Sequence, residues 1–185
     1  LEEKKLNTFV KLNPTLLGFD RVRQILDTCG FEYLIVKPES FEHDLKLDRA
    51  KEMLRRLRAL ASEKKLQFGV KLTNTLGSVN HKGVLPGEEF YMSGRALFPL
   101  SINVAAVLSR EFNGDLPISY SGGASLYNIK DIFDCGIRPI TMATDLLKPG
   151  GYGRMLECVK ELDTSDTWGM TKVDVDAVEA LAAKA

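Results

Sequence analysis

Residues 118–133 read ISYSGGASLYNIKDIF, and this stretch decides the class of fold. Its first residues are apolar and β-forming, and Ser121, Gly122 and Gly123 follow at once. A helical pattern begins at Asn128. A strand that passes directly into a helix is the βα unit from which parallel sheets are built. The two glycines are needed either by the turn itself or by a group that must approach the backbone closely.

The same alternation extends over the whole chain. Strands are predicted where apolar residues alternate or run together, at 7–13, 31–37, 66–76, 116–121 and 137–144. Helices are predicted where apolar residues recur at helical spacing, at 18–28, 45–65, 99–112, 128–135, 155–162 and 173–184. A loop rich in glycine, asparagine and proline is expected at 78–88.

These elements predict an α/β fold with parallel strands alternating with helices. A closed (β/α)8 barrel has eight strands and typically about 250 residues, whereas this chain has 185 residues and five expected strands. The fold is therefore either an open doubly wound sheet or a partial (β/α)8 TIM-type barrel. The chain begins at Leu1 and soon enters a strand, so we expect it to be a piece of something longer.

Composition excludes several functions. Lysine plus arginine and aspartate plus glutamate each number 25, so no net field attracts nucleic acid or a membrane surface. No apolar run is long enough to cross a bilayer. Cys29, Cys135 and Cys158 lack CxxC spacing, which argues against a disulfide framework and against a self-contained metal site. Cys29 and Cys135 are expected to be buried packing residues of a cytoplasmic protein, and Cys158 is expected within a helix.

Two expected strands carry a lysine near their carboxyl ends, which is where parallel α/β proteins bind ligands. Because side chains alternate along a strand, Lys11 and Asn13 share one face. Lys71 and Thr73 likewise share a face, and Asn74 lies at the mouth of the same strand. An unpaired buried ammonium is costly, so each lysine either reaches solvent or a carboxylate, or binds an anionic ligand.

Small residues follow the next two strands. Gly122 and Gly123 leave room for an anion that the N–H groups of the following helix could bind, although a plain βα turn also favours glycine. The last expected strand ends in Ala143 and Thr144, before the sequence KPGG. Two consecutive loops of this kind are typical of the phosphate site that barrels build after strands seven and eight.

The runs VKLTNT, YMSGRALFP, PISYSGGAS and PITMATDLLKPGGY resemble the C-terminal half of the flavin barrels of dihydroorotate and dihydropyrimidine dehydrogenases. Over residues 7–168 the chain more closely resembles selenate reductase-type subunits, which are large multidomain iron–sulfur flavoproteins of bacteria. That similarity is carried by FVKLNPTLLGF, GVKLTNTLG, GRALFPLSINVAAVLSREFNG and ATDLLKPGGY. It implies that residues 1–162 are such a half-barrel and that 163–185 are a polar linker and an amphipathic helix. Segment 37–65 resembles an insertion that simple barrels of this type do not need.

The resemblance also implies an FMN site. The implied ring contact is Lys11 or Lys71, and the implied polar residues at strand and loop ends are Asn74, Ser93 and Gly94. The implied cradle for the FMN phosphate is formed by Gly122, Gly123, Ala143 and Thr144. The catalytic cysteine or serine of these dehydrogenases follows an earlier strand, so the resemblance implies no catalytic residue and no metal ligand here.

The sequence is thus interpreted as a piece of a cytoplasmic, flavin-dependent oxidoreductase that is inactive alone. Iron–sulfur clusters, FAD and NAD(P) are expected only on other domains, which would be its partners. Self-association through an open sheet edge is also expected. Two alternatives stay open, which are a cofactor-free docking scaffold and an aldolase-type barrel in which Lys71 forms a Schiff base.

Overall fold

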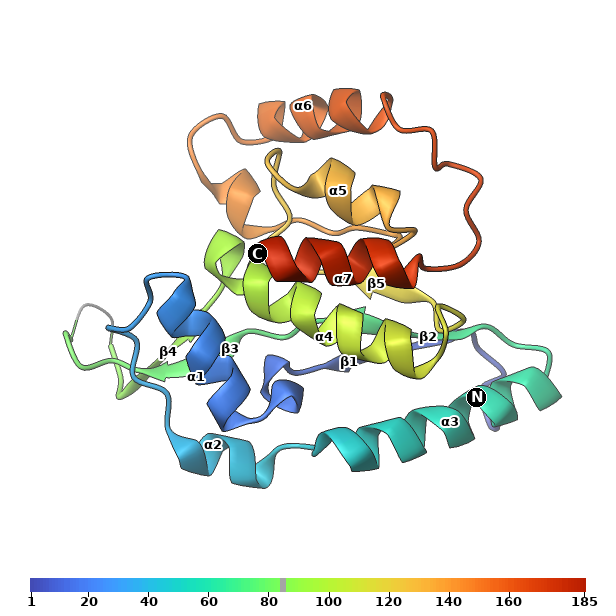
Figure 1. Ribbon diagram of the computed structural model, residues 1–185, viewed down its shortest axis with the longest axis horizontal. Coiled ribbons are helices and arrows are strands. Elements are labelled where there is room, and N and C mark those ends of the chain that lie inside the picture. The colour runs from blue at the N-terminus through green and yellow to red at the C-terminus, as the bar shows by residue number, and fades with distance from the viewer. Residues whose placement is uncertain (84–85) are drawn as a thin grey trace.

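The computed structural model describes residues 1–83 and 86–185 and is an α/β fold with a parallel sheet, as predicted (Figure 1). The sheet has the order β1-β2-β5, with β1 at Thr8–Leu12, β2 at Phe68–Leu72 and β5 at Ile118–Tyr120. Ile140 extends it by a parallel bridge to Tyr120. The described residues thus form an open arrangement of parallel strands and no closed barrel.

The expected helices are confirmed with small shifts of their ends. They are α1 (Phe19–Thr28), α3 (Leu47–Glu63), α4 (Phe98–Glu111), α5 (Ile129–Asp134), α6 (Gly153–Leu162) and α7 (Val175–Lys184). A short helix α2 (Pro38–His43) and three 3-10 turns were not expected, namely η1 (Pro14–Leu17), η2 (Gly94–Leu97) and η3 (Thr144–Leu147). None of the helices in the described residues is long and apolar enough to cross a membrane.

Helices cover one face of the sheet. In Figure 1, α4 and α7 lie across the front of the strands, and α3 runs below them. The core on this side joins buried sheet residues such as Val70, Leu72 and Tyr120 to residues of α4 such as Ile102 and Leu108. The segment expected to be a linker and helix is part of this core, since α7 packs along α4.

The other face of the sheet is more open. The parallel register pairs Lys11 with Lys71 and Lys71 with Ser119, so these three side chains project from the same face. The exposed Phe9 lies on this face too, against the Cα of Gly69. A polar, half-open face of this kind is what the interior of an incomplete barrel presents.

The strand expected at 31–37 is wrong. The segment is a loop in which Leu34 and Val36 are buried while Tyr33 and Ile35 are exposed. The alternation of apolar residues therefore matches the alternation of buried and exposed side chains. The segment is nevertheless not a strand of the sheet, because β1 pairs directly with β2 and leaves no place for a strand between them. One backbone bond, from Val79 N–H to Ile35 C=O at 2.8 Å, attaches this loop to the neighbouring hairpin.

Two further strand predictions need correction. The strand expected at 66–76 ends at Leu72, and residues 76–79 begin an antiparallel hairpin of β3 (Leu76–Val79) and β4 (Glu89–Met92). The loop expected at 78–88 is thus partly hairpin, and its residues 84–85 lie outside the described residues. The strand expected at 137–144 is reduced to the single bridge at Ile140.

Candidate functional site

The carboxyl ends of the parallel strands open into a cavity of about 260 Å³. Loops after β1, β2, β5 and the 137–142 segment line it, together with η2 and η3. The lining residues are Lys11, Thr73, Thr75, Ser93, Gly94, Arg95, Leu97, Ser121, Gly123, Ala124, Thr141, Met142, Ala143, Thr144 and Asp145. This is the edge where parallel α/β folds bind their ligands. A larger groove, of about 620 Å³, runs along α3, but Arg49, Glu52 and Arg56 line it rather than strand ends.

The cavity wall forms because three turns touch one another through glycines. Gly123 has a φ of +78°, and a Cβ there would lie 2.3 Å from the carbonyl oxygen of Gly94. Gly94 has a φ of +70°, and a Cβ there would lie 2.8 Å from Cγ2 of Thr144. Both positions require glycine because of their backbone angle and their close contacts. The group that lies against the Gly123 backbone is therefore the turn at Gly94, which comes earlier in the same chain.

Gly122 has a different neighbour. A Cβ there would lie 2.0 Å from Oγ of Ser101, on the first turn of α4. The Ser101 hydroxyl is 2.7 Å from that of Thr73, and both residues are buried. Tyr120, also fully buried, has a pKa raised well above its usual value, because burial outweighs a hydrogen bond from Ser101. A neutral cluster of hydroxyl groups thus supports the floor beneath the glycine turn.

Positive charge lies at the rim of the cavity. Lys11 and Arg95 are exposed, and the Arg95 guanidinium lies 5.2 Å from the centre of the Tyr127 ring. Hydroxyl groups also line the wall, where Thr144 donates to Ser93 over 3.4 Å. No described residue forms an ion pair with Lys11. These groups are donors suited to an anionic, oxygen-rich ligand.

One lining residue is acidic. The Asp145 side chain is 7% exposed, and Lys148 and Arg154 approach its carboxylate at 3.4 and 3.6 Å. Neither cation lines the cavity, so the carboxylate of Asp145 is paired with positive charge from outside the lining.

The structure brings together six of the nine residues expected to bind a cofactor. They are Lys11, Ser93, Gly94, Gly123, Ala143 and Thr144. Gly122 lies behind the wall against Ser101. Lys71 lies beside Lys11 on the next strand, away from the lining. Asn74 donates to Asn13 over 2.7 Å, and Asn13 donates to Asp44, so this amide ties strand ends together.

Nine of the fifteen lining residues were not among the predicted site residues, and three polar or charged ones show why. Arg95 directly follows Ser93 and Gly94, and its charge next to a predicted loop was the available signal. Asp145 follows Thr144 in the same way. Thr73 was seen only as a strand residue, because nothing in its local sequence shows that β2 ends at Leu72.

Of the two cysteines expected to be buried, Cys135 is buried and Cys29 is only half-buried. Cys158, in α6, is buried as well. Burial, with nearby aspartates, raises the pKa of Cys135 to about 12. Burial, followed by the charge of Asp145, also raises the pKa of Cys158. These thiols are protonated at neutral pH, and the described residues contain no cluster of side chains that could hold a metal ion.

A parallel α/β domain with a cavity at the carboxyl ends of its strands is typical both of TIM barrels and of open doubly wound folds. Residues 1–185 match the family described as "Oxidoreductase YgfK, N-terminal TIM-barrel domain", and the chain belongs to that family. It is 73% identical over 185 residues to the protein named "Putative oxidoreductase YgfK" in Escherichia coli K12, and equally to that of Escherichia coli O157:H7. All of this chain but only 18% of each relative is covered. No solved structure matches the chain.

These comparisons confirm that the chain is a TIM-barrel domain of an oxidoreductase family and that its relatives are much longer. The comparisons do not specify the flavin, the iron–sulfur clusters, NAD(P) or a selenate substrate. These stay predictions.

Proposed function

We propose that this region binds the phosphate end of FMN in the cavity at the strand ends, as part of a flavin-dependent oxidoreductase. The observation that carries the proposal is the meeting of the turns at Gly94, Gly123 and Thr144 with two cations, Lys11 and Arg95, in one cavity. The family supports the class of reaction, since it is one of oxidoreductases.

The residues present fit a phosphate. A phosphate group offers only acceptor oxygens at neutral pH and carries negative charge. The cavity supplies the guanidinium of Arg95, the ammonium of Lys11 and the hydroxyls of Ser93 and Thr144. In this proposal Arg95 and the hydroxyls would hold the phosphate against the turns. Lys11, on the open face of the sheet, would contact the part of the cofactor that extends from the loops.

The bound flavin would supply hydride or electron transfer, which no side chain of this region can perform. Lys11 would place positive charge beside the ring, where negative charge develops on reduction. Lys71 occupies the neighbouring strand in register, so it remains a candidate for the same contact. In the full-length protein, iron–sulfur clusters, FAD and NAD(P) would be held by other domains, in the cytoplasm. We propose no particular electron acceptor, because selenate enters only through the name of the family that the sequence resembles.

The test uses the purified full-length protein. We expect a flavin absorption spectrum and the release of FMN on denaturation. Arg95→Gln is expected to weaken FMN binding about tenfold, because one charged hydrogen bond is worth about 1.4 kcal/mol or more. Arg56→Gln removes an exposed arginine on α3 and is the matched control.

The outcomes separate the alternatives. A colourless full-length protein that binds no added FMN would overturn the proposal and favour a docking scaffold. A borohydride-trapped adduct at Lys71 would instead favour a Schiff-base enzyme.

A further inference from the structure

A second cavity, of about 650 Å³, lies between α5, α6 and the 137–142 segment. Its lining is mainly apolar and includes Ile140, Met142, Met155, Val159 and Trp168. Several of these side chains are open to solvent, with exposed fractions of 40% for Met155, 48% for Val159 and 57% for Trp168. Neighbouring apolar side chains in one groove at this exposure mark a surface that binds another apolar surface.

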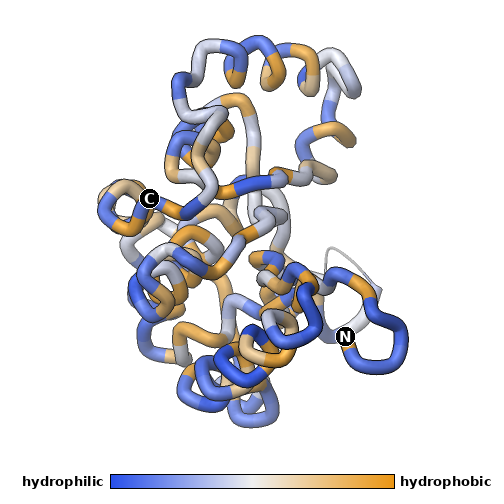
Figure 2. The backbone as a smooth tube through the Cα atoms, turned by 90° about the vertical axis from the view of Figure 1, so that its right-hand side faces the viewer, coloured by the Kyte–Doolittle hydropathy of each residue, from blue (hydrophilic) through white to orange (hydrophobic). Residues whose placement is uncertain are grey.

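Helix α6 reaches over this groove. It packs mainly against α5 and η3, and it lies at the top of the molecule, apart from the sheet (Figure 1). Blue and orange turns alternate along it in Figure 2, as in a helix with one apolar face. Cys158, on that face, is buried, whereas Val159 beside it is half exposed. The apolar face of α6 is therefore only partly covered by this chain.

The sheet has a free edge at the same place. Tyr120 donates to Pro139 C=O and accepts from Thr141 N–H, at 2.9 and 2.8 Å. In a parallel bridge of this form the N–H and C=O of Ile140 point to the opposite side. No residue in 1–83 or 86–185 pairs with them. A free strand edge thus borders an apolar groove that one helix overhangs.

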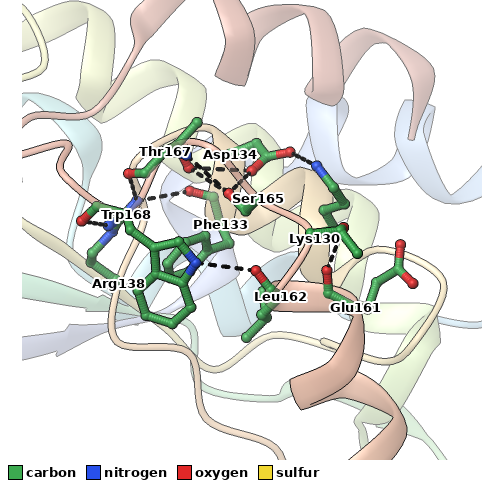
Figure 3. A network of polar contacts seen from close by, with 10 residues as sticks. Lys130, Phe133, Asp134, Arg138, Glu161, Leu162, Ser165, Thr167 and Trp168 are labelled. Atoms are coloured by element: carbon green, nitrogen blue, oxygen red, sulfur yellow. Dashed lines mark hydrogen bonds and ion pairs between the residues drawn. The ribbon is translucent and has the colours of Figure 1, made fainter.

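The groove is fixed by a polar network, shown in Figure 3. The Asp134 carboxylate accepts hydrogen bonds from Lys130, Ser165 and Thr167. Burial alone would raise the pKa of Asp134, but these bonds hold it below its usual value.

Arg138 completes the network. It donates to the carbonyls of Trp168, Thr167 and Phe133 at 3.0, 3.0 and 3.2 Å. The Trp168 indole N–H donates to Leu162 C=O at 3.2 Å. Trp168 is thereby held at the groove by its own indole N–H and by the Arg138 guanidinium.

We propose that this groove receives a parallel β-strand from the part of the full-length protein that lies outside residues 1–185. The strand would pair with the free N–H and C=O of Ile140, and its apolar side chains would cover Val159 and Met155. The relatives are several times longer than this chain, which covers 18% of them. Within the described residues the parallel sheet consists of β1, β2, β5 and the bridge at Ile140, whereas a closed barrel of this class needs eight strands.

A strand of the same polypeptide is favoured over a second copy. A tethered segment acts at an effective concentration that reaches the millimolar range for short linkers. A second copy would in addition have to be present at high concentration.

Hydrogen exchange in the full-length protein, read at the single amide of Ile140, tests the proposal, because the amides of Arg138 and Thr141 are already hydrogen-bonded within residues 1–185. We expect the Ile140 amide to exchange at least 100-fold more slowly than in an unstructured peptide, because it would be hydrogen-bonded within a sheet. Exchange close to the unstructured rate would overturn the proposal. Protection that disappears when the protein is diluted would also overturn it, because it would identify a second copy.

A pair of variants tests the groove itself. Val159→Asp puts a charge into the groove and is expected to accelerate exchange of the Ile140 amide at least tenfold. Leu156→Asp makes the same change of charge at an exposed apolar residue of α6 that does not line the groove, and it is expected to leave that exchange unchanged. If Val159→Asp does not fold, Val159→Ala is expected to accelerate exchange at least twofold. Equal exchange in Val159→Ala and the parent protein would contradict the proposal.

Discussion

Replacing Gly122 with alanine tests the packing beneath the candidate site. The new Cβ would lie 2.0 Å from Oγ and 2.3 Å from Cβ of Ser101. Ser101 cannot move away, because it is fully buried on α4 and hydrogen-bonded to Thr73. Gly122 does not have a positive φ, so the cost comes from the contact alone. Overpacking of this kind costs about 1–3 kcal/mol.

A second substitution should relieve that cost. Ser101→Gly removes both atoms that the alanine would meet. Alone it costs about 2 kcal/mol, from a lost hydrogen bond and a glycine in a helix. In the double variant the alanine methyl occupies the vacated space. We therefore expect the double variant to be more stable than the sum of the single effects by at least about 1 kcal/mol.

Urea unfolding of residues 1–185, followed by far-ultraviolet circular dichroism, measures these free energies. Gly123→Ala is the contrast, since its Cβ would meet the backbone of Gly94, and Ser101→Gly should not rescue it. Gly153→Ala is the control, because nothing lies within 4 Å of a Cβ there. Strict additivity of Gly122→Ala and Ser101→Gly would refute the reasoning.

Two further predictions concern titrating groups. Asp134→Asn should destabilise the protein by about 1–3 kcal/mol at neutral pH and shift Trp168 emission to longer wavelength, because the segment that holds the indole loses its acceptor. Since the pKa of Asp134 is lowered from 3.8 in the folded state, its contribution is present above that value and is lost as pH falls through the folded pKa, so variant and parent should converge in acid. An acid-independent difference would contradict this. The pKa of Cys135 is about 12, so Cys135 and Cys158 should resist a thiol reagent at neutral pH until denaturant is added. Rapid labelling of either in the folded protein would show that the thiol is not buried.

The helices could be predicted because their apolar stripes are long and local. Leu54 and Ala61 of α3, for example, are both buried, as the spacing required. The strands were harder, because a strand exists only where a partner pairs with it. The segment at 31–37 has a strand's alternation but no free neighbour in the sheet. The hairpin of β3 and β4 has the opposite property, since LGSV has weak strand preference and is held by pairing with EFYM.

The candidate site was predictable at the level of loops rather than side chains. The rule that ligands bind at the carboxyl ends of parallel strands selects the turns at Gly123 and Thr144, which line the cavity, whereas Gly94 was expected only from the family resemblance. It does not tell a glycine that faces a cavity from one that faces a helix, and Gly122 is of the second kind. Nor does it reveal that Asn74 bonds to Asn13, because that pairing joins residues 61 positions apart in the chain.

The contact between the glycine turns has a consequence for how this cavity can change over evolutionary time. Its outline is set by main-chain atoms that touch one another, while its chemistry is set by rim side chains such as Arg95 and Ser93. Substitutions at the rim can therefore alter ligand preference one residue at a time without reshaping the cavity. A substitution at Gly94 or Gly123 would change the outline and disturb the start of α4 together. The shape of the cavity is thus expected to be inherited with the fold, and its ligand preference to diverge.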